Sequence, residues 1–201
     1  MLEQTIRDTY QIWLVDPVAR WIGCQLSPIT ITIFSGLIGL LFIPLIAGHY
    51  TLSAIIVLLI SGYLDTLDGT VARLQKSDSD IGSLLDLMTD RVVEFAAVLG
   101  FYWLNPLQHA LPALLMLGSM LICITSFLAV GIFTANDSHK SFHYSPGLME
   151  RAEAFIFFIV MALFPAAFID LAYIFAVLVS LTAVIRIYQF IKQYQLVSKI
   201  N

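Results

Sequence analysis

The sequence predicts an all-α integral membrane protein with six transmembrane helices, preceded by an N-terminal amphipathic helix that lies in the membrane interface. Three observations lead to this prediction. The 201 residues are 59% hydrophobic and only 12% charged, and their mean hydropathy is +0.89, which is outside the range of a soluble domain. Long uncharged runs recur along the chain, and the basic residues fall in alternate connections between them. Because these connections are short, residues 1–201 are expected to form a single domain.

Residues 1–27 are predicted to form the interfacial helix. Their apolar side chains recur at helical spacing, and the charged side chains lie off that stripe. Trp13 and Trp21 are expected at the level of the lipid headgroups, where amphipathic rings are stable. The segment lacks the apolar core of a signal peptide, so insertion is expected to depend on the spans themselves.

Six apolar segments follow in order. The first is an uncharged run of about 20 residues, enough to cross a hydrocarbon core of ~30 Å at 1.5 Å per residue. A polar run, 75–80, joins the second span to the third, and a tight turn at Pro165 precedes the sixth. The predicted spans are about residues 29–48, 52–74, 81–103, 110–133, 147–164 and 169–191.

The ten lysines and arginines predict the orientation. All of them lie near the termini or flank the second-to-third and fourth-to-fifth connections. The connections near residues 49–51, 104–109 and 165–168 contain none. Because basic residues are retained on the cytoplasmic side, both termini and the second-to-third connection are expected to face the cytoplasm.

Four aspartates interrupt the apolar pattern on either side of that connection: Asp65, Asp68, Asp86 and Asp90. A carboxylate near the centre of a membrane helix costs roughly 2.5 to 3.5 kcal/mol, so four of them together require a cause. Their spacings of three and four place each pair on one helix face. A divalent cation would relieve their mutual repulsion. With no His or Cys in the stretch, the oxygen donors favour Mg²⁺ or Mn²⁺ over zinc, and four carboxylates would suit two ions.

Two glycines lie beside these aspartates. Mg²⁺ usually shares its coordination shell with substrate phosphates, so the cluster is interpreted as a docking site for a phosphate or pyrophosphate ester. Gly69 and Gly82 would let a phosphate or a base approach the backbone. The alternative for either glycine is ordinary close packing of membrane helices.

The stretch resembles the signature of the CDP-alcohol phosphotransferase family at every defined position: Asp65-x2-Asp68-Gly69-x2-Ala72-Arg73-x8-Gly82-x3-Asp86-x3-Asp90. The six spans and the cytoplasmic motif also resemble that family. The resemblance implies an enzyme in which an acceptor hydroxyl attacks the lipid-side phosphorus of CDP-diacylglycerol, CMP leaves, and a phospholipid forms. It implies that the first three aspartates hold metal and that Asp90 takes the proton of the acceptor hydroxyl beside the second metal ion. It also implies a homodimer with one site per protomer.

The same resemblance assigns the donor contacts. Gly69, Ala72 and Gly82 are expected near the cytidine. Arg73 is expected to meet a phosphate or to pair with an acid of the cluster, and the alternative is a topology anchor at the membrane surface. The start of the first span is similar to that of the family. Ile29 departs from it where Asn is common, whereas Thr32 remains available and is expected to contact the nucleotide or substrate.

The acceptor is expected to be a small polyol: inositol, inositol phosphate or glycerol 3-phosphate. Residues 85–91 are similar to phosphatidylinositol synthases. Lys140, Arg151 and Arg186 are candidates to bind an acceptor phosphate, with a purely topological role as the equal alternative. Glu94, one turn deeper than Asp90, is expected to pair with Arg91 or with another helix. No nucleic acid partner is expected.

Two other functions compete with this interpretation. Intramembrane prenyltransferases also hold Mg-pyrophosphate with helical aspartates, but they look longer and have two well-separated motifs. A divalent-cation transporter would carry its carboxylates nearer the bilayer midplane, whereas these aspartates cluster where the spans meet water.

Overall fold

The computed structural model of the protein describes residues 10–23, 25–77, 79–133 and 149–197. Every regular element in these ranges is a helix, which confirms the all-helical class. Backbone contacts divide the chain into two compact units, Met1–Pro106 and Leu107–Asn201. The single domain over residues 1–201 stays a prediction.

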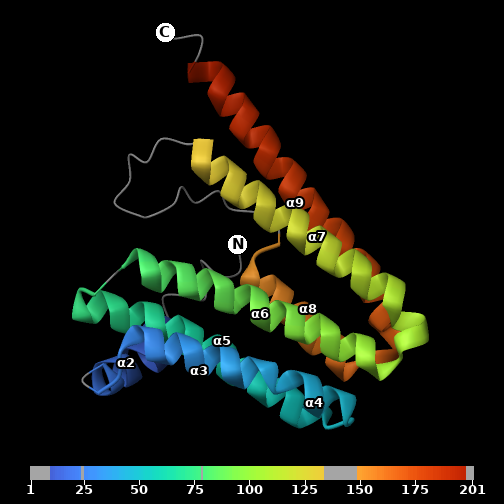
Figure 1. Cartoon of the computed structure of the whole chain (residues 1–201), viewed down its shortest axis with the longest axis horizontal. Coiled ribbons are helices and arrows are strands. Elements are labelled where there is room, and N and C mark those ends of the chain that lie inside the picture. The colour runs from blue at the N-terminus through green and yellow to red at the C-terminus, as the bar shows by residue number, and fades with distance from the viewer. Residues whose placement is uncertain (1–9, 24, 78, 134–148, 198–201) are drawn as a thin grey trace. The chain divides into compact units, whose positions relative to one another are not determined.

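The first unit holds the N-terminal elements and the aspartates. It consists of η1 (Gln11–Val15), α2 (Asp16–Ile22), α3 (Pro28–Leu40), α4 (Phe42–Ala47), α5 (Thr51–Gln75) and α6 (Asp80–Leu104). Helices α3 and α4 each pack against both α5 and α6, and η1 and α2 lie against α5 (Figure 1). Thus α5 and α6, which carry the four aspartates, share the neighbour α3.

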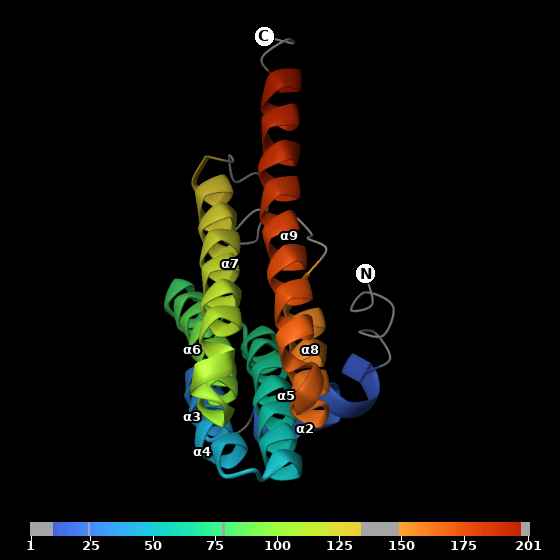
Figure 2. The same ribbon diagram turned by 90° about the vertical axis from the view of Figure 1, so that its right-hand side faces the viewer.

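The second unit holds α7 (Pro106–Phe133), α8 (Arg151–Leu163), the short 3-10 helix η2 (Pro165–Ala167) and α9 (Phe168–Val197). Helix α8 packs beside the first half of α9 after the turn through η2 (Figure 2). Phe158 of α8 is fully buried, and its ring centroid lies 5.7 Å from that of Phe175 on α9. Aromatic contacts therefore hold this helix pair together.

Each of the six predicted spans falls on helix in the described residues, with four differences at the boundaries. The first span is divided at Leu41, between α3 and α4; the fourth helix begins at Pro106; the fifth, predicted from residue 147, begins at Arg151; and the last continues to Val197. Four segments are long and apolar enough to cross a membrane: Pro28–Ala47, Thr51–Gln75, Pro106–Phe133 and Pro165–Gln195. This finding supports an integral membrane protein.

Helices α6 and α8 are the two predicted spans outside that class. Helix α6 has 25 residues but carries Asp80, Asp86, Asp90, Arg91 and Glu94. Helix α8 has 13 residues, about 20 Å at 1.5 Å per residue, which is shorter than a hydrocarbon core of ~30 Å. Six spans therefore stay a prediction.

The described part of the N-terminal segment is helical from Gln11 to Ile22, as η1 followed by α2. Val15 and Ala19 are fully buried in a cluster with Leu67 and Val71 of α5. Trp13 and Trp21 are 77% and 69% exposed. The segment thus has one face packed on α5 and exposed tryptophans elsewhere; its placement in a membrane interface stays a prediction.

A short reversal joins the end of α5 to the start of α6. Helix α5 stops at Gln75, because Lys76 takes a left-handed conformation (φ 51°) and its N–H turns back to the carbonyls of Ala72 and Arg73. Ser79 starts α6, and its Oγ accepts a hydrogen bond of 3.1 Å from the Gly82 N–H. The reversal is short, so the end of α5 and the start of α6 stay close.

Close packing of α3 on α6 positions the other side of the site. A Cβ atom added to Gly39 would lie 2.6 Å from Cγ2 of Val93, and one added to Gly36 would lie 2.9 Å from Cγ2 of Thr89. Only glycine permits this approach. The turn of α6 that bears Asp90 is therefore held against α3.

Candidate metal and substrate site

Three of the four predicted aspartates form a cluster. Asp65 and Asp68 of α5 and Asp86 of α6 each offer a carboxylate oxygen, and these oxygens lie within 4.8 Å of one another. Asp68 is 4% exposed, and the other two are half-buried. Two carboxylates at such a distance repel by roughly 3 kcal/mol at an effective dielectric of about 20, and a cation between them would remove that cost. The oxygen-only donor set fits Mg²⁺ or Mn²⁺.

Thr32 connects α3 to the cluster. Its hydroxyl donates a short hydrogen bond to Oδ2 of Asp68, and both side chains are buried. Nearby, the Ser35 hydroxyl donates to the Ser61 carbonyl at 2.8 Å, which joins α3 to α5. Thr32, predicted to contact the substrate, therefore fixes the orientation of one carboxylate of the cluster.

Asp90 lies one turn beyond Asp86 on α6, on the same helix face, and is half-buried. It does not belong to the 4.8 Å cluster found among the described residues. Its two assigned roles, as the base and as an additional metal ligand, stay predictions.

Among the described residues, no neighbouring helix fills the space beside the two motif glycines. A Cβ atom at Gly69 would meet only Nη1 of Arg73, at 3.5 Å, and one at Gly82 would meet only Oγ of Ser79, at 3.2 Å, in the described part of the chain. Neither glycine is needed there for helix packing. The interpretation that a ligand approaches the backbone at Gly69 and Gly82 is therefore favoured, with half-buried Ala72 on the same face of α5.

Arg73 is exposed, yet its side chain follows the helix back toward the aspartates. Nη2 donates to Oγ1 of Thr70 at 3.0 Å, and Nη1 is the atom nearest the open side of Gly69. The guanidinium therefore lies beside the motif face of α5, and its role at the site stays a prediction.

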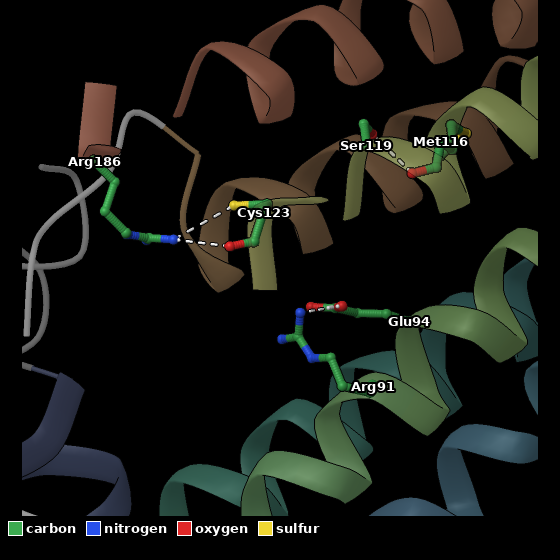
Figure 3. A network of polar contacts seen from close by, with 6 residues as sticks. All are labelled: Arg91, Glu94, Met116, Ser119, Cys123 and Arg186. Carbon is green, nitrogen blue, oxygen red and sulfur yellow. Dashed lines mark hydrogen bonds and ion pairs between the residues drawn. The ribbon is translucent and has the colours of Figure 1, made fainter. Parts of the chain in front are cut away.

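Glu94 has the partner that the sequence predicted. Its Oε2 lies 2.7 Å from Nη1 of Arg91, and the Glu94 side chain is 6% exposed (Figure 3). The pair joins residues three apart on α6, so the buried carboxylate is compensated within its own helix.

The candidate acceptor residues belong to the second half of the chain. Arg186 of α9 is buried, and its Nη1 donates to the Cys123 carbonyl of α7 at 3.1 Å (Figure 3) and lies 3.4 Å from Oγ of Ser126. Its guanidinium also lies 5.3 Å from the ring centroid of Phe127. Arg151 starts α8 and lies over Phe155. Lys140 falls outside the described residues.

Sequence reasoning missed several polar residues that the structure brings to these side chains. Thr70 contacts Arg73, and Gln11 contacts Thr70 at 2.9 Å across 59 positions of sequence. Ser126 and Cys123 contact Arg186. No sequence signal marks them, because Thr70 is an undefined position of the motif and the others lie in segments without a motif.

Comparison with known proteins identifies relatives over most of the chain. Residues 25–188 match the family described as CDP-alcohol phosphatidyltransferase. The inner membrane protein YnjF of Escherichia coli is 33% identical over 170 residues, which cover 81% of this chain and 82% of that protein. A phosphatidylinositol phosphate synthase of Corynebacterium glutamicum is 31% identical over 148 residues, covering 71% of this chain and 66% of that protein. An archaetidylinositol phosphate synthase of Pyrococcus horikoshii is 26% identical over 171 residues, covering 85% of this chain and 87% of that protein.

Solved structures share the fold. A phosphatidylinositol phosphate synthase of Mycobacterium tuberculosis with CDP-DAG bound matches with a TM-score of 0.75 and 20% identity, covering 88% of this chain and 93% of that chain. The same enzyme in complex with manganese and citrate matches with a TM-score of 0.74, also at 20% identity, covering 88% of each chain. At this identity the likeness concerns the fold alone.

Proposed function

Since the chain belongs to the CDP-alcohol phosphatidyltransferase family, we propose that it transfers the phosphatidyl group of CDP-diacylglycerol to a hydroxyl of a small polyol or polyol phosphate and releases CMP. The observation that carries the proposal is the cluster of Asp65, Asp68 and Asp86, whose oxygens lie within 4.8 Å across α5 and α6. Family membership favours this reaction over prenyl transfer and cation transport. An ether-linked donor lipid is compatible with the same cluster.

In the proposed reaction, the acceptor oxygen bonds to the lipid-side phosphorus. The bond from that phosphorus to the bridging oxygen of the pyrophosphate breaks, and the electron pair leaves with CMP. Asp90 accepts the proton of the attacking hydroxyl. Asp65, Asp68 and Asp86, with Asp90 as a further candidate ligand, would hold Mg²⁺ or Mn²⁺, proposed as two ions, whose positive charge stabilises the reacting phosphates. Thr32 keeps Asp68 in place for that role.

The donor is proposed to lie on the face of α5 that carries Gly69 and Ala72. The open side of Gly69 admits a phosphate or the cytidine close to the backbone, and Gly82 does the same at the start of α6. Arg73 donates to a donor phosphate from the edge of this face. The observation that supports its part is the direction of its guanidinium, toward Gly69.

Inositol phosphate is the favoured acceptor among the three candidates, because two relatives are named as phosphatidylinositol phosphate and archaetidylinositol phosphate synthases. We propose that Lys140, Arg151 and Arg186 bind its phosphate. The Arg186 guanidinium is buried, and its Nε has no hydrogen-bond partner within the described residues. A buried cation of this kind is stabilised by an anion, and the guanidinium fork suits phosphate.

The membrane arrangement proposed with this function has six spans, an interfacial helix over residues 1–27, and the termini and aspartates on the cytoplasmic side. The alternation of basic and non-basic connections supports the sidedness. The exposed Trp13 and Trp21 support the interfacial helix. A homodimer with one site per protomer rests on the family resemblance.

The test is release of CMP by the purified protein from CDP-diacylglycerol. Inositol, inositol phosphate, glycerol 3-phosphate and serine are offered separately, with Mg²⁺, with Mn²⁺ and with EDTA. We expect CMP in one polyol lane and only with added metal. Absence of CMP in every lane, or full release in EDTA, would refute the function as proposed.

Asp90→Asn tests the assignment of the base. We expect kcat to fall by about 10² to 10⁴, the usual contribution of general base catalysis, while Mn²⁺ and CDP binding stay measurable. Asp80→Asn is the matched control, because Asp80 is an exposed aspartate at the start of the same helix and should leave kcat near that of the wild type. Wild-type kcat in Asp90→Asn would contradict the assignment.

A further inference from the structure

We propose that Gln11 and Thr70 are positioning residues that hold the Arg73 guanidinium beside the open side of Gly69, so that the helical segment before the first span forms part of the donor site. This inference rests on the proposed function, because it assumes that Arg73 binds a donor phosphate. It concerns residues outside the aspartate signature, and it gives the N-terminal segment a role in substrate binding besides membrane association.

The Thr70 hydroxyl is the centre of the arrangement. It donates to the Thr66 carbonyl at 3.0 Å, and it accepts from Nη2 of Arg73 at 3.0 Å and from Nε2 of Gln11 at 2.9 Å. A hydroxyl has one proton and two acceptor sites, so these three bonds use its full capacity. Thr70 is 4% exposed. Its position and the directions of its bonds are therefore well determined.

The Gln11 amide has one workable orientation. Its Nε2 donates both to Thr70 and to Oδ1 of Asp16, the latter at 2.8 Å. The reverse orientation would place the amide oxygen against the Asp16 carboxylate, which cannot donate. The side chain thus presents an N–H to Thr70, and Thr70 has its other acceptor site available for Arg73.

Independent contacts fix the segment that carries Gln11. The Tyr63 hydroxyl donates to the Leu14 carbonyl at 2.9 Å, and Val15 and Ala19 are fully buried against α5. Farther along, Nε2 of Gln75 donates to the Gly23 carbonyl at 2.7 Å and to the Leu26 carbonyl at 3.1 Å. The segment therefore lies along α5 on both sides of Thr70, and the Gln11 contact does not stand alone.

These contacts order the guanidinium of Arg73, an exposed side chain. A long cationic side chain at the surface samples many rotamers, and a ligand that binds it must order it. The bond to Thr70 uses one of the five N–H groups of Arg73 and leaves the others available to a phosphate. Ordering the guanidinium before the donor arrives strengthens binding of the donor in the ground state, so its loss should raise KM more than it lowers kcat.

The experiment measures KM and kcat for CDP-diacylglycerol in saturating acceptor and Mn²⁺. We expect Thr70→Val, which removes the hydroxyl at nearly constant volume, and Gln11→Leu to raise KM by about fivefold to tenfold with kcat within about twofold. Thr70→Ser should restore the wild-type KM. In an Arg73→Ala background, Gln11→Leu should have no further effect, because it acts through Arg73.

Gln75→Leu is the matched control for a general weakening of the contacts between the N-terminal segment and α5. It removes two hydrogen bonds between the segment and α5 and leaves the Gln11–Thr70–Arg73 contacts in place, so its KM should equal that of the wild type. An unchanged KM in Thr70→Val, additive effects of Gln11→Leu and Arg73→Ala, or an equal rise in Gln75→Leu would each overturn the inference.

A measurement without substrate separates this inference from the proposed function. In protein labelled with ¹⁵N-arginine, the Nε–H signal of Arg73 is assigned by its loss in Arg73→Lys, and its heteronuclear NOE reports fast motion of the side chain. We expect a lower NOE in Thr70→Val and in Gln11→Leu than in the wild type. An unchanged NOE in both variants refutes the positioning role even where CMP release fails, and a lowered NOE in an inactive protein refutes only the function.

Discussion

Asp68→Asn should make the metal-free protein more stable and the metal-bound protein less stable than the wild type. At the outer separation of 4.8 Å and an effective dielectric of about 20, each pair of ionised carboxylates repels by roughly 3 kcal/mol. Neutralising Asp68 removes the two pairs in which it takes part. Opposing this gain, the Thr32 hydrogen bond loses its ionised acceptor, and solvent screens the half-buried partners.

The two pairs together amount to roughly 6 kcal/mol, and we take screening and the weakened hydrogen bond to offset about two thirds of it. We therefore expect a gain of about 2 kcal/mol in the free energy of unfolding without metal, which corresponds to a rise of about 4 to 8 °C in unfolding temperature for a chain of this size. With Mn²⁺ at about 100 times its dissociation constant, the wild type gains about 2.7 kcal/mol by mass action. The variant binds the ion more weakly, so Mn²⁺ raises its free energy of unfolding much less. The order of the two unfolding temperatures should therefore reverse between EDTA and Mn²⁺.

The assay compares apparent unfolding temperatures of detergent-purified wild type, Asp68→Asn and Asp80→Asn at pH 8, in EDTA and in Mn²⁺. Asp80→Asn should follow the wild type in its response to Mn²⁺, because Asp80 is exposed and lies outside the cluster. Two results would refute the view that the clustered carboxylates repel one another and hold the ion. One is an unfolding temperature of Asp68→Asn below that of the wild type in EDTA, and the other is a rise of that temperature with Mn²⁺ as large as in the wild type.

Two further predictions concern helix packing and a buried ion pair. Gly69→Ala should keep or slightly raise stability, because its Cβ meets only the end of Arg73 and alanine favours helix by about 1 kcal/mol, yet it should raise KM for the donor. Gly39→Ala, whose Cβ would clash with Val93 at 2.6 Å, should lower the free energy of unfolding by about 1 to 3 kcal/mol. Equal thermal unfolding of the two variants would contradict this. Glu94→Gln should cost about 1 to 2 kcal/mol in chemical denaturation by weakening the buried pair with Arg91, and unchanged stability would show that the pair contributes nothing.

Much of the helical layout follows from the sequence. The uncharged runs and the polar connection after Gln75 predict helix positions close to those observed. The break at Leu41 and the extension to Val197 escaped prediction, because helix ends depend on tertiary contacts more than on composition. The apolar pattern alone does not determine how many helices cross the membrane, because α6 is long enough to span it but carries five charged residues.

The aspartate signature predicted the composition of the site but not its shape. Spacing along α5 and α6 placed Asp65 with Asp68, and Asp86 with Asp90. Only the tertiary structure, in which α5 and α6 both pack on α3, shows that the first three converge within 4.8 Å and that Asp90 is not part of this cluster among the described residues. Distances between helices depend on which residues pack at their interface, and here the contact of Gly39 with Val93 sets that of α3 with α6.

By itself, the sequence determined the family, the helical class and the identity of the acidic residues, because each depends on local spacing and residue type. Tertiary structure alone decided which polar groups from other helices bond to side chains at the site: Thr32 donates to Asp68, and Gln11 donates to Thr70 across 59 positions. The physical reason is that hydrogen bonds act over about 3 Å in space, regardless of separation in sequence. A residue that supports the site from another helix has no fixed spacing to reveal it.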